Sequence, residues 1–173
     1  MARLRPMSTP LHAAPDRYVP LAEMRALVGR ETGVSDWLTV GQDRIDAFAD
    51  LCGDHQFIHV DPPRASKTPM GGTVAHGFLT LSLLSYLAAG VRPRIEGTRH
   101  AVNYGFDRVR FAAPVPAGAR IRARFALAAL EEVRPGEVSL AWDVTVEIEG
   151  SEISQGGRPA LAARWLTRSY LEA

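Results

Sequence analysis

Residues 74–91 read VAHGFLTLSLLSYLAAGV and form the most apolar stretch of the chain. One histidine and three small hydroxyl side chains interrupt it. A transmembrane helix needs about 20 mostly apolar residues. We therefore interpret the stretch as a helix buried in a globular core. We expect it to run from about His76 to Ala89 and to end at Gly90.

The sequence after this helix shows the alternation of apolar and polar side chains that is typical of strands with one buried face. Strand patterns cover residues 101–112, 120–127, 142–148 and 159–170. Arg134-Pro135-Gly136 predicts the turn between the second and third strands. On the third strand we expect four polar residues on the solvated face: Asp143, Thr145, Glu147 and Glu149.

Shorter elements precede the buried helix. We expect a helix over Pro20–Gly29, a strand over Ser35–Val40 and a second helix over Gln42–Cys52 that ends at Gly53. Asp61 followed by Pro62 predicts the start of a further helical turn. Helices followed by a run of antiparallel strands predict an α+β fold, with the sheet packed on one dominant helix.

Composition limits the broad class of protein. The chain has 173 residues, and we expect an extended or partly disordered lead over residues 1–19 and a single domain over residues 20–173. Lys and Arg total 20 against 19 Asp and Glu, so nothing favours a nucleic-acid or membrane partner. Cys52 is the only cysteine, which excludes an internal disulfide and a cysteine-based zinc site. We expect a cytoplasmic protein with no signal peptide.

Chemistry-bearing side chains gather just before the buried helix. Asp54 and Asp61 lie beside His55 and His59, and His76 follows. Taken singly, an aspartate after a helix-ending glycine is usually a turn residue, and an isolated histidine is usually structural. Their clustering next to the most apolar segment favours a functional site.

Residues 53–61, GDHQFIHVD, resemble the hydratase 2 motif of MaoC-like (R)-specific enoyl-CoA hydratases, which is Gly-Asp-x-Asn-Pro-aliphatic-His-x-Asp. The stretches GGTVAHGF (71–78), NYGFDRVRF (103–111) and PVPAG (114–118) are also similar to that family, especially to the subgroup named after nodulation protein N. Gln56 and Phe57 stand where the motif has Asn and Pro. Gln56 keeps the amide with one more methylene, and Phe57 adds bulk, so both bear on the shape of the site.

The resemblance implies a hot-dog fold, in which a curved antiparallel sheet wraps around one long apolar helix. It also implies a homodimer whose active-site tunnel is lined partly by the second subunit. The expected substrate is a trans-2-enoyl thioester of coenzyme A or of an acyl carrier protein, hydrated reversibly to the (R)-3-hydroxyacyl thioester. We expect no metal and no cofactor, with coenzyme A present only as part of the substrate.

The resemblance also implies roles for individual residues. Asp54 and His59 are the expected catalytic pair, which holds and activates one water between them. We assign the Gly77 N–H as the donor to the thioester oxygen, the alternative being a glycine needed for helix start or close packing. Asn103 is expected to line the tunnel. Three residues are expected to support the site from behind: Gln56, Asp61 and His76.

Three other readings remain open. His59-Val60-Asp61 would offer two ligands for Fe(II) if a further histidine joined them. His76 is too near in sequence for the usual barrel version of such a site, and His100 is the other candidate. Hot-dog folds also serve as non-catalytic acyl-binding modules, and a thioesterase is possible on the same fold.

Overall fold

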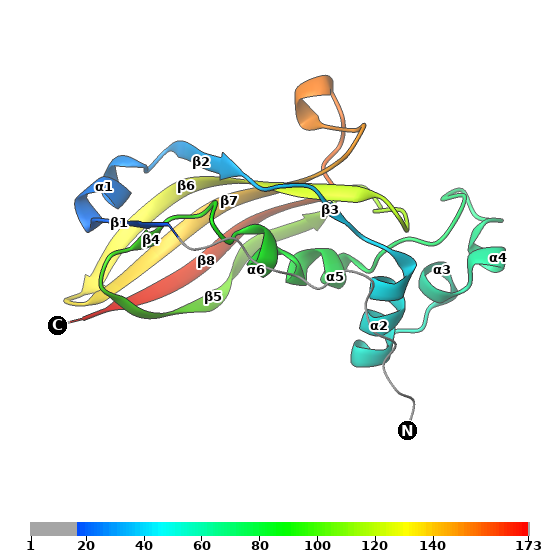
Figure 1. Cartoon of the computed structure of the whole chain (residues 1–173), viewed down its shortest axis with the longest axis horizontal. Helices are drawn as coiled ribbons and strands as arrows, with labels where there is room; N and C mark the ends of the chain where they lie inside the picture. Colours follow the sequence, from blue (N-terminus) through cyan, green and yellow to red (C-terminus); the bar gives the residue numbers. More distant parts are fainter. Residues whose placement is uncertain (1–16, 173) are drawn as a thin grey trace.

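The computed structural model describes residues 17–172, which form one curved sheet with helices inside its curve and at its ends (Figure 1). The strands of the large sheet are β2 Arg30–Val34, β3 Leu38–Thr39, β5 Thr98–Phe111, β6 Arg120–Arg134, β7 Glu137–Ile148 and β8 Leu161–Leu171. Their order is β2-β6-β7-β8-β5, all antiparallel, and β3 also pairs with β6. The strand between the central helix and β6 in sequence, β5, therefore lies at one edge.

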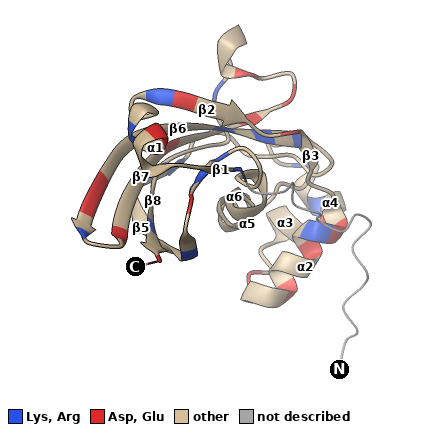
Figure 2. Ribbon diagram, turned by 60° about the vertical axis from the view of Figure 1, so that its left-hand side comes forward, with Lys and Arg blue, Asp and Glu red and all other residues tan. Residues whose placement is uncertain are grey.

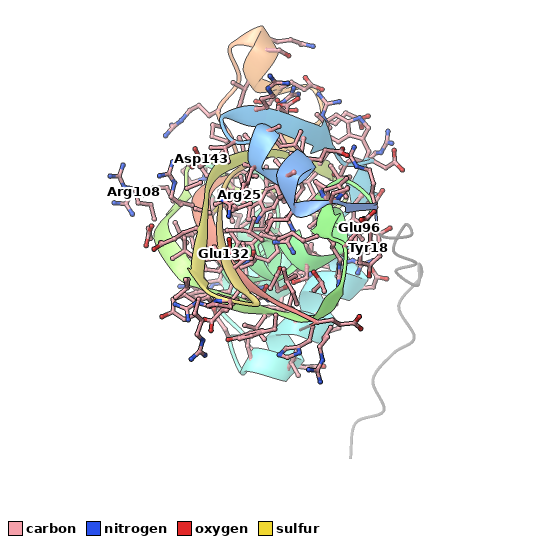
Figure 3. The ribbon with its side chains drawn as sticks, turned by 90° about the vertical axis from the view of Figure 1, so that its left-hand side faces the viewer. Tyr18, Arg25, Glu96, Arg108, Glu132 and Asp143 are labelled. Atoms are coloured by element: carbon pink, nitrogen blue, oxygen red, sulfur yellow. The ribbon has the colours of Figure 1, made fainter. Side chains whose placement is uncertain are left out.

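The helices are short. They are α1 Leu21–Ala26, α2 Gln42–Cys52, α3 Phe57–Val60, α4 Pro62–Ala65, α5 Gly77–Ser82, α6 Leu84–Leu87 and the 3-10 turn η1 Ile153–Gln155. Figure 2 shows the sheet curving around α5 and α6, while α2, α3 and α4 gather at one end. At the other end, Arg25 of α1 contacts Glu132 at the end of β6 with 2.7 Å between N and O, and Figure 3 labels both. Over the described residues, no helix has the length and apolar character needed to cross a membrane.

The predicted central helix is present but divided at Leu83. This residue keeps helical dihedrals, φ −68° and ψ −14°, and its N–H still donates to the Leu79 carbonyl at 3.0 Å. The two pieces therefore follow one path, as expected. Their buried leucines pack on the sheet with Phe125, Trp142 and Trp165, which are at most 2% exposed. Burying a large apolar side chain contributes about 1.5–3 kcal/mol. The packing of the helix leucines on the sheet therefore supplies much of the stability of the core.

The second helix has the predicted bounds, Gln42–Cys52, and ends at Gly53 with φ 78°, a conformation that favours glycine. The segment after it differs from expectation. We expected no helix between Gly53 and Asp61, but α3, Phe57–Val60, places His59 on a helical turn. Asp61 caps α4 as predicted, since its side chain accepts a hydrogen bond from the Arg64 N–H at 3.0 Å. Such a cap contributes about 1 kcal/mol.

Two strand predictions need correction. The strand expected over Ser35–Val40 is present only as β3, Leu38–Thr39, and β2, Arg30–Val34, was not predicted. The pairing of β2 with β6 shifts register between Glu31 and Gly33, so β2 shows no regular alternation. Glu147, expected on the solvated face of β7, is fully buried. It is retained there because Arg122 donates to it at 2.8 Å and the Ile153 N–H of η1 at 3.3 Å.

The predicted N-terminal lead lies mostly outside the described residues. Its last two residues, Tyr18–Val19, form β1 and pair in parallel with β4, Arg94–Ile95. These two residues are therefore extended and are held beside the segment that follows α6. Residues 20–172 supply the remaining elements of the fold.

Candidate active site

His59 is held in one orientation by the chain in front of the central helix. Its ring is buried, and its Nδ1 lies 2.7 Å from the carbonyl oxygen of Val74. A carbonyl only accepts, so Nδ1 carries the proton and Nε2 is the acceptor of the neutral ring. Val74 is itself fixed, because its N–H donates to the Ile58 carbonyl at 3.0 Å and it pairs with Pro116. The backbone therefore sets both the position and the tautomer of His59.

Asp54 follows Gly53, the residue that ends α2, and its side chain bonds to the backbone two residues further along. Its Oδ1 accepts a hydrogen bond from the Gln56 N–H at 3.3 Å, a turn that aspartate commonly makes. The side chain is 55% exposed, unlike that of His59. Asp54 thus presents a solvated carboxylate at the edge of a buried imidazole.

His76 joins these two residues. It is 3% exposed, its Nε2–H donates to the Asp54 backbone carbonyl at 2.9 Å, and its ring stacks on that of His59 with centroids 3.7 Å apart. Phe48 of α2 packs against it with ring centroids 5.2 Å apart. The remaining nitrogen, Nδ1, is buried and has no hydrogen-bond partner among residues 17–172. His76 therefore fixes the backbone of one site residue and the ring of another.

One polar side-chain atom from each of Asp54, His59 and His76 lies within 4.8 Å of the other two. One water can bridge groups separated by that distance, because each of its hydrogen bonds spans about 2.8 Å. The arrangement can therefore hold a water between a carboxylate and an imidazole nitrogen. The sequence predicted the proximity of Asp54 and His59 but not the stacked second imidazole.

Beside this cluster is a cavity of about 370 Å³. His59 lines it together with Gly77 and Thr80 of α5. The remaining lining is mainly apolar: Ile58, Met70, Val74, Ala75, Phe111, Ala113, Pro114 and Ala160. An apolar hollow with a few polar groups is the usual form of a small-molecule site.

Gly77 is needed where it lies. A Cβ at this position would come within 2.8 Å of the Phe111 ring, closer than side chains tolerate. Gly77 is also the first residue of α5, so its N–H has no acceptor within the helix. The close-packing role and the predicted donor role of Gly77 are therefore compatible.

Comparison with known proteins identifies the family. Residues 23–148 match the family described as MaoC like domain. The chain belongs to the MaoC-like family.

Two relatives of this MaoC-like chain have similar lengths. It is 48% identical to nodulation protein N of Rhizobium leguminosarum bv. viciae, over 85% of this chain and 89% of that protein. It is 44% identical to 3-hydroxyacyl-thioester dehydratase Z of Mycobacterium tuberculosis, over 87% of this chain and 96% of that protein. Among solved structures, the monoamine oxidase regulatory protein of Archaeoglobus fulgius superposes with a TM-score of 0.73 at 21% identity, covering 92% of this chain and all of that one. These neighbours confirm the hot-dog fold.

Not every residue predicted for the MaoC-like site lies there. Asn103, on β5, does not line the cavity at His59 and instead borders a second hollow. Gln56 contributes its backbone N–H to Asp54. Asp61 is occupied in capping α4 and is not part of the cluster of Asp54, His59 and His76.

The sequence did not reveal the role of Gln42, a residue of α2 that bonds to two segments of the MaoC-like site. Its side-chain amide donates to the His59 carbonyl at 2.7 Å and accepts from the Thr73 hydroxyl at 2.5 Å. Gln42 thus ties the helix, the His59 turn and the segment before the central helix together. The sequence predicted Gln42 only as the first residue of the second helix, because no local pattern shows contacts to residues 17 and 31 positions away.

The hypothesis of a metal site can be tested against the arrangement of Asp54, His59 and His76. Carboxylate and imidazole groups of this kind can bind a divalent ion. The set differs from the one considered from sequence, because Asp54 stands in place of Asp61, and His76, which we had judged too near in sequence, stands in place of His100. The rings of His59 and His76 are stacked with only 25° between their planes. Since a metal lies in the plane of each imidazole that binds it, stacked rings direct their nitrogens poorly toward one ion. A metal-free site stays our prediction.

His55 lies outside this cluster and pairs with Asp50 of α2, with 2.9 Å between Nε2 and Oδ1. The hydrogen bond that His55 donates to Asp50 raises the pKa of His55 above its usual value, against a smaller opposing effect of desolvation. This pair connects the last turn of α2 to the segment that carries Asp54. His55 is exposed and does not line the cavity at His59.

Proposed function

We propose that this chain is a hydro-lyase that interconverts trans-2-enoyl and (R)-3-hydroxyacyl thioesters, with coenzyme A or an acyl carrier protein as the thiol. The observation that carries the proposal is the convergence of Asp54 and His59 within 4.8 Å beside an apolar cavity bordered by Gly77. The dehydratase name of one relative supports the reaction class, and the site resemblance supports the stereochemistry.

Hydration needs a water held beside C3 of the enoyl group and a base to take its proton. The neutral tautomer of His59 leaves Nε2 as an acceptor, since Nδ1–H is committed to Val74. Asp54 supplies a second acceptor for the same water. As the water oxygen bonds to C3, its proton passes to the Asp54–His59 pair, and the pair delivers a proton to C2. Positioned acid–base groups of this kind contribute about 10²–10⁴ in rate.

The electrons of the double bond move toward the thioester oxygen during this addition. The N–H of Gly77, at the start of α5, is our assigned donor to that oxygen. The absence of a side chain lets the thioester carbonyl approach the backbone closely. A single donor at a developing oxyanion commonly contributes about 3 kcal/mol.

The test is loss of the conjugated enoyl-thioester absorbance with crotonyl-CoA. We expect the wild-type protein to hydrate it, and Asp54→Asn and His59→Gln to fall by about 10²-fold or more in kcat/KM. Matched controls are Asp50→Asn and His55→Gln, which change the same residue types in an exposed pair outside the cavity. These should keep activity within a few-fold of wild type.

Two alternatives give different results in the same assay. A non-catalytic acyl-binding module would bind the thioester without any loss of absorbance. A thioesterase would release free thiol, which a thiol reagent detects, whereas hydration keeps the thioester intact. Activity in the wild type that survives both site variants would overturn our assignment of Asp54 and His59.

We also propose that the active form is a cytoplasmic homodimer. Support comes from β5, a 14-residue strand that pairs with β8 on one side and has no partner strand on the other within the described chain. Its last residue, Phe111, lines the cavity at His59. A second copy placed along β5 would therefore border the site.

A further inference from the structure

The ring of Phe111 lies against the first residue of the central helix. A Cβ on Gly77 would meet three adjacent ring carbons, Cγ at 2.8 Å, Cδ2 at 2.9 Å and Cδ1 at 3.0 Å. Nearly equal distances to three adjacent ring atoms mean that the ring presents its face, and not its edge, to Gly77. Both residues also line the cavity at His59. The cavity therefore has a flat aromatic wall at the level of the helix start.

The backbone on both sides of this contact is held by hydrogen-bonded neighbours. Phe111 is the last residue of β5 and pairs with Leu161 of β8. Two residues before Gly77, the Ala75 N–H donates to the Val115 carbonyl at 2.8 Å. The spacing between the end of the strand and the start of the helix is therefore set by the fold, and a ligand widens it only by disturbing these contacts.

Phe78 restricts the ring of Phe111 from another side. The two rings pack edge to face, with their centres 5.9 Å apart and 71° between their planes. Phe78 is 69% exposed and does not line the cavity at His59. The ring of Phe111 therefore has contacts with Gly77 and with Phe78, and both favour the orientation in which its face covers the glycine.

The reaction proposed above determines which substrate atoms meet this wall, and the inference rests on that proposal. The thioester oxygen accepts from the Gly77 N–H, for which the usual distance is about 2.9 Å. C2, the carbon next to the thioester carbon, is two bonds from that oxygen and therefore lies at the level of the helix start. The remaining acyl carbons extend away from it. Substituents on C2 are thus the ones that approach the ring of Phe111.

We propose that Phe111 makes the site selective for acyl thioesters that carry no branch at C2. A planar, unbranched enoyl group can lie parallel to the face of the ring. A methyl branch adds a carbon that needs about 3.5–4.0 Å to each ring carbon. Three ring carbons already lie within 3.0 Å of the place where one carbon would be added to Gly77, so the space between them does not admit a branch.

Butyryl-CoA and isobutyryl-CoA test the selectivity, because they are isomers that differ only in a branch at C2 and neither has a double bond to hydrate. Isothermal titration calorimetry with the wild-type protein gives both dissociation constants. We expect isobutyryl-CoA to bind about 10-fold more weakly, the usual effect of one misplaced methyl group. Phe111→Ala should make the two constants nearly equal, and Phe111→Leu should give an intermediate ratio.

Phe78→Ala is the matched control, because it removes a neighbouring aromatic ring that does not line the cavity. It should keep the wild-type ratio of the two constants. A ratio lost equally in Phe78→Ala would overturn the proposal, since the shared aromatic edge and not the wall at Gly77 would then be responsible. A ratio that survives in Phe111→Ala would also overturn it, since another residue would then exclude the branch.

The wild-type comparison needs no variant. Equal binding of the two isomers, or no binding of either, contradicts the selectivity. These results are separate from those of the hydration assay. A preference for butyryl-CoA without hydration of crotonyl-CoA would support the wall at Phe111 and remove the proposed reaction. Hydration of crotonyl-CoA with equal binding of the two isomers would remove the selectivity alone.

Discussion

At the scale of single residues, His76 offers the sharpest test of how the site is built. Its Nε2–H holds the Asp54 carbonyl and its ring holds that of His59. His76→Gln keeps a donor and loses the stacked ring, whereas His76→Phe keeps a ring and loses the donor. We expect both variants to lower kcat by about 10-fold or more, because small misplacements of reacting groups are costly, while KM changes much less. Steady-state kinetics on crotonyl-CoA measures this.

A purely structural His76 would behave differently. The variants would then lose thermal stability while the folded fraction kept wild-type kcat. His55→Gln is the matched control, as another histidine of the same segment whose ring pairs with Asp50 away from the cavity. Unchanged kcat in both His76 variants would contradict the positioning role.

Sequence alone identified Asp54 and His59 because they are close in the chain and match a family motif. It did not reveal the partnership of His59 with His76, nor the two contacts of Gln42. These contacts form only when the segment over residues 53–61 packs against α2 and against the start of α5. Asn103 borders the hollow beside α6 and not the cavity at His59, and its place along a curved strand could not be predicted from sequence.

At the scale of elements, the pair of Asp50 and His55 joins α2 to the segment that bears Asp54. Because the pKa of His55 is raised above 6.5 in the folded chain, chiefly by the hydrogen bond to Asp50, the pair stabilises the fold at pH values below 6.5. That contribution disappears as the pH rises through the higher folded pKa. We therefore expect Asp50→Asn to destabilise the protein at about pH 5.5 and not at about pH 8.5.

Urea unfolding at both pH values measures this difference, and an NMR titration of His55 should show its pKa lowered by Asp50→Asn. Glu23→Gln, which removes an exposed carboxylate from α1, is the control. Equal destabilisation by Asp50→Asn at both pH values would show that a structural contact, and not the charge of His55, accounts for the effect.

The bounds of helices and strands show which features the periodicity of apolar residues can predict and which it cannot. Gln42–Cys52 was predicted in full because a clear apolar stripe ends at a glycine. The strand β2 was not predicted, since a register shift between Glu31 and Gly33 interrupts the alternation of its side chains. Glu147 was placed on the wet face by alternation, which cannot reveal that η1 covers that face and Arg122 compensates the charge.

At the scale of the whole molecule, the edge of β5 that has no partner strand among residues 17–172 calls for an explanation. Long exposed edges promote association, and proteins usually shorten, charge or cover them. The opposite edge, β2, has five residues and a register shift. The β5 edge instead has 14 residues and exposes Val102, Tyr104 and Phe111, with Phe78 packed against Phe111 at 5.9 Å between ring centres. A covered β5 is therefore the arrangement we expect in solution.

Val102→Lys places a charge on this edge and should convert a dimer into a monomer, as measured by size-exclusion chromatography with light scattering. Val28→Lys is the matched control, because Val28 is 42% exposed, close to the 41% of Val102, and lies between α1 and β2. Since Phe111 at the end of β5 also lines the cavity, we expect the monomer to lose most of its hydratase activity. A wild-type monomer, or a Val102→Lys variant that remains a fully active dimer, would show that the two copies do not meet at β5.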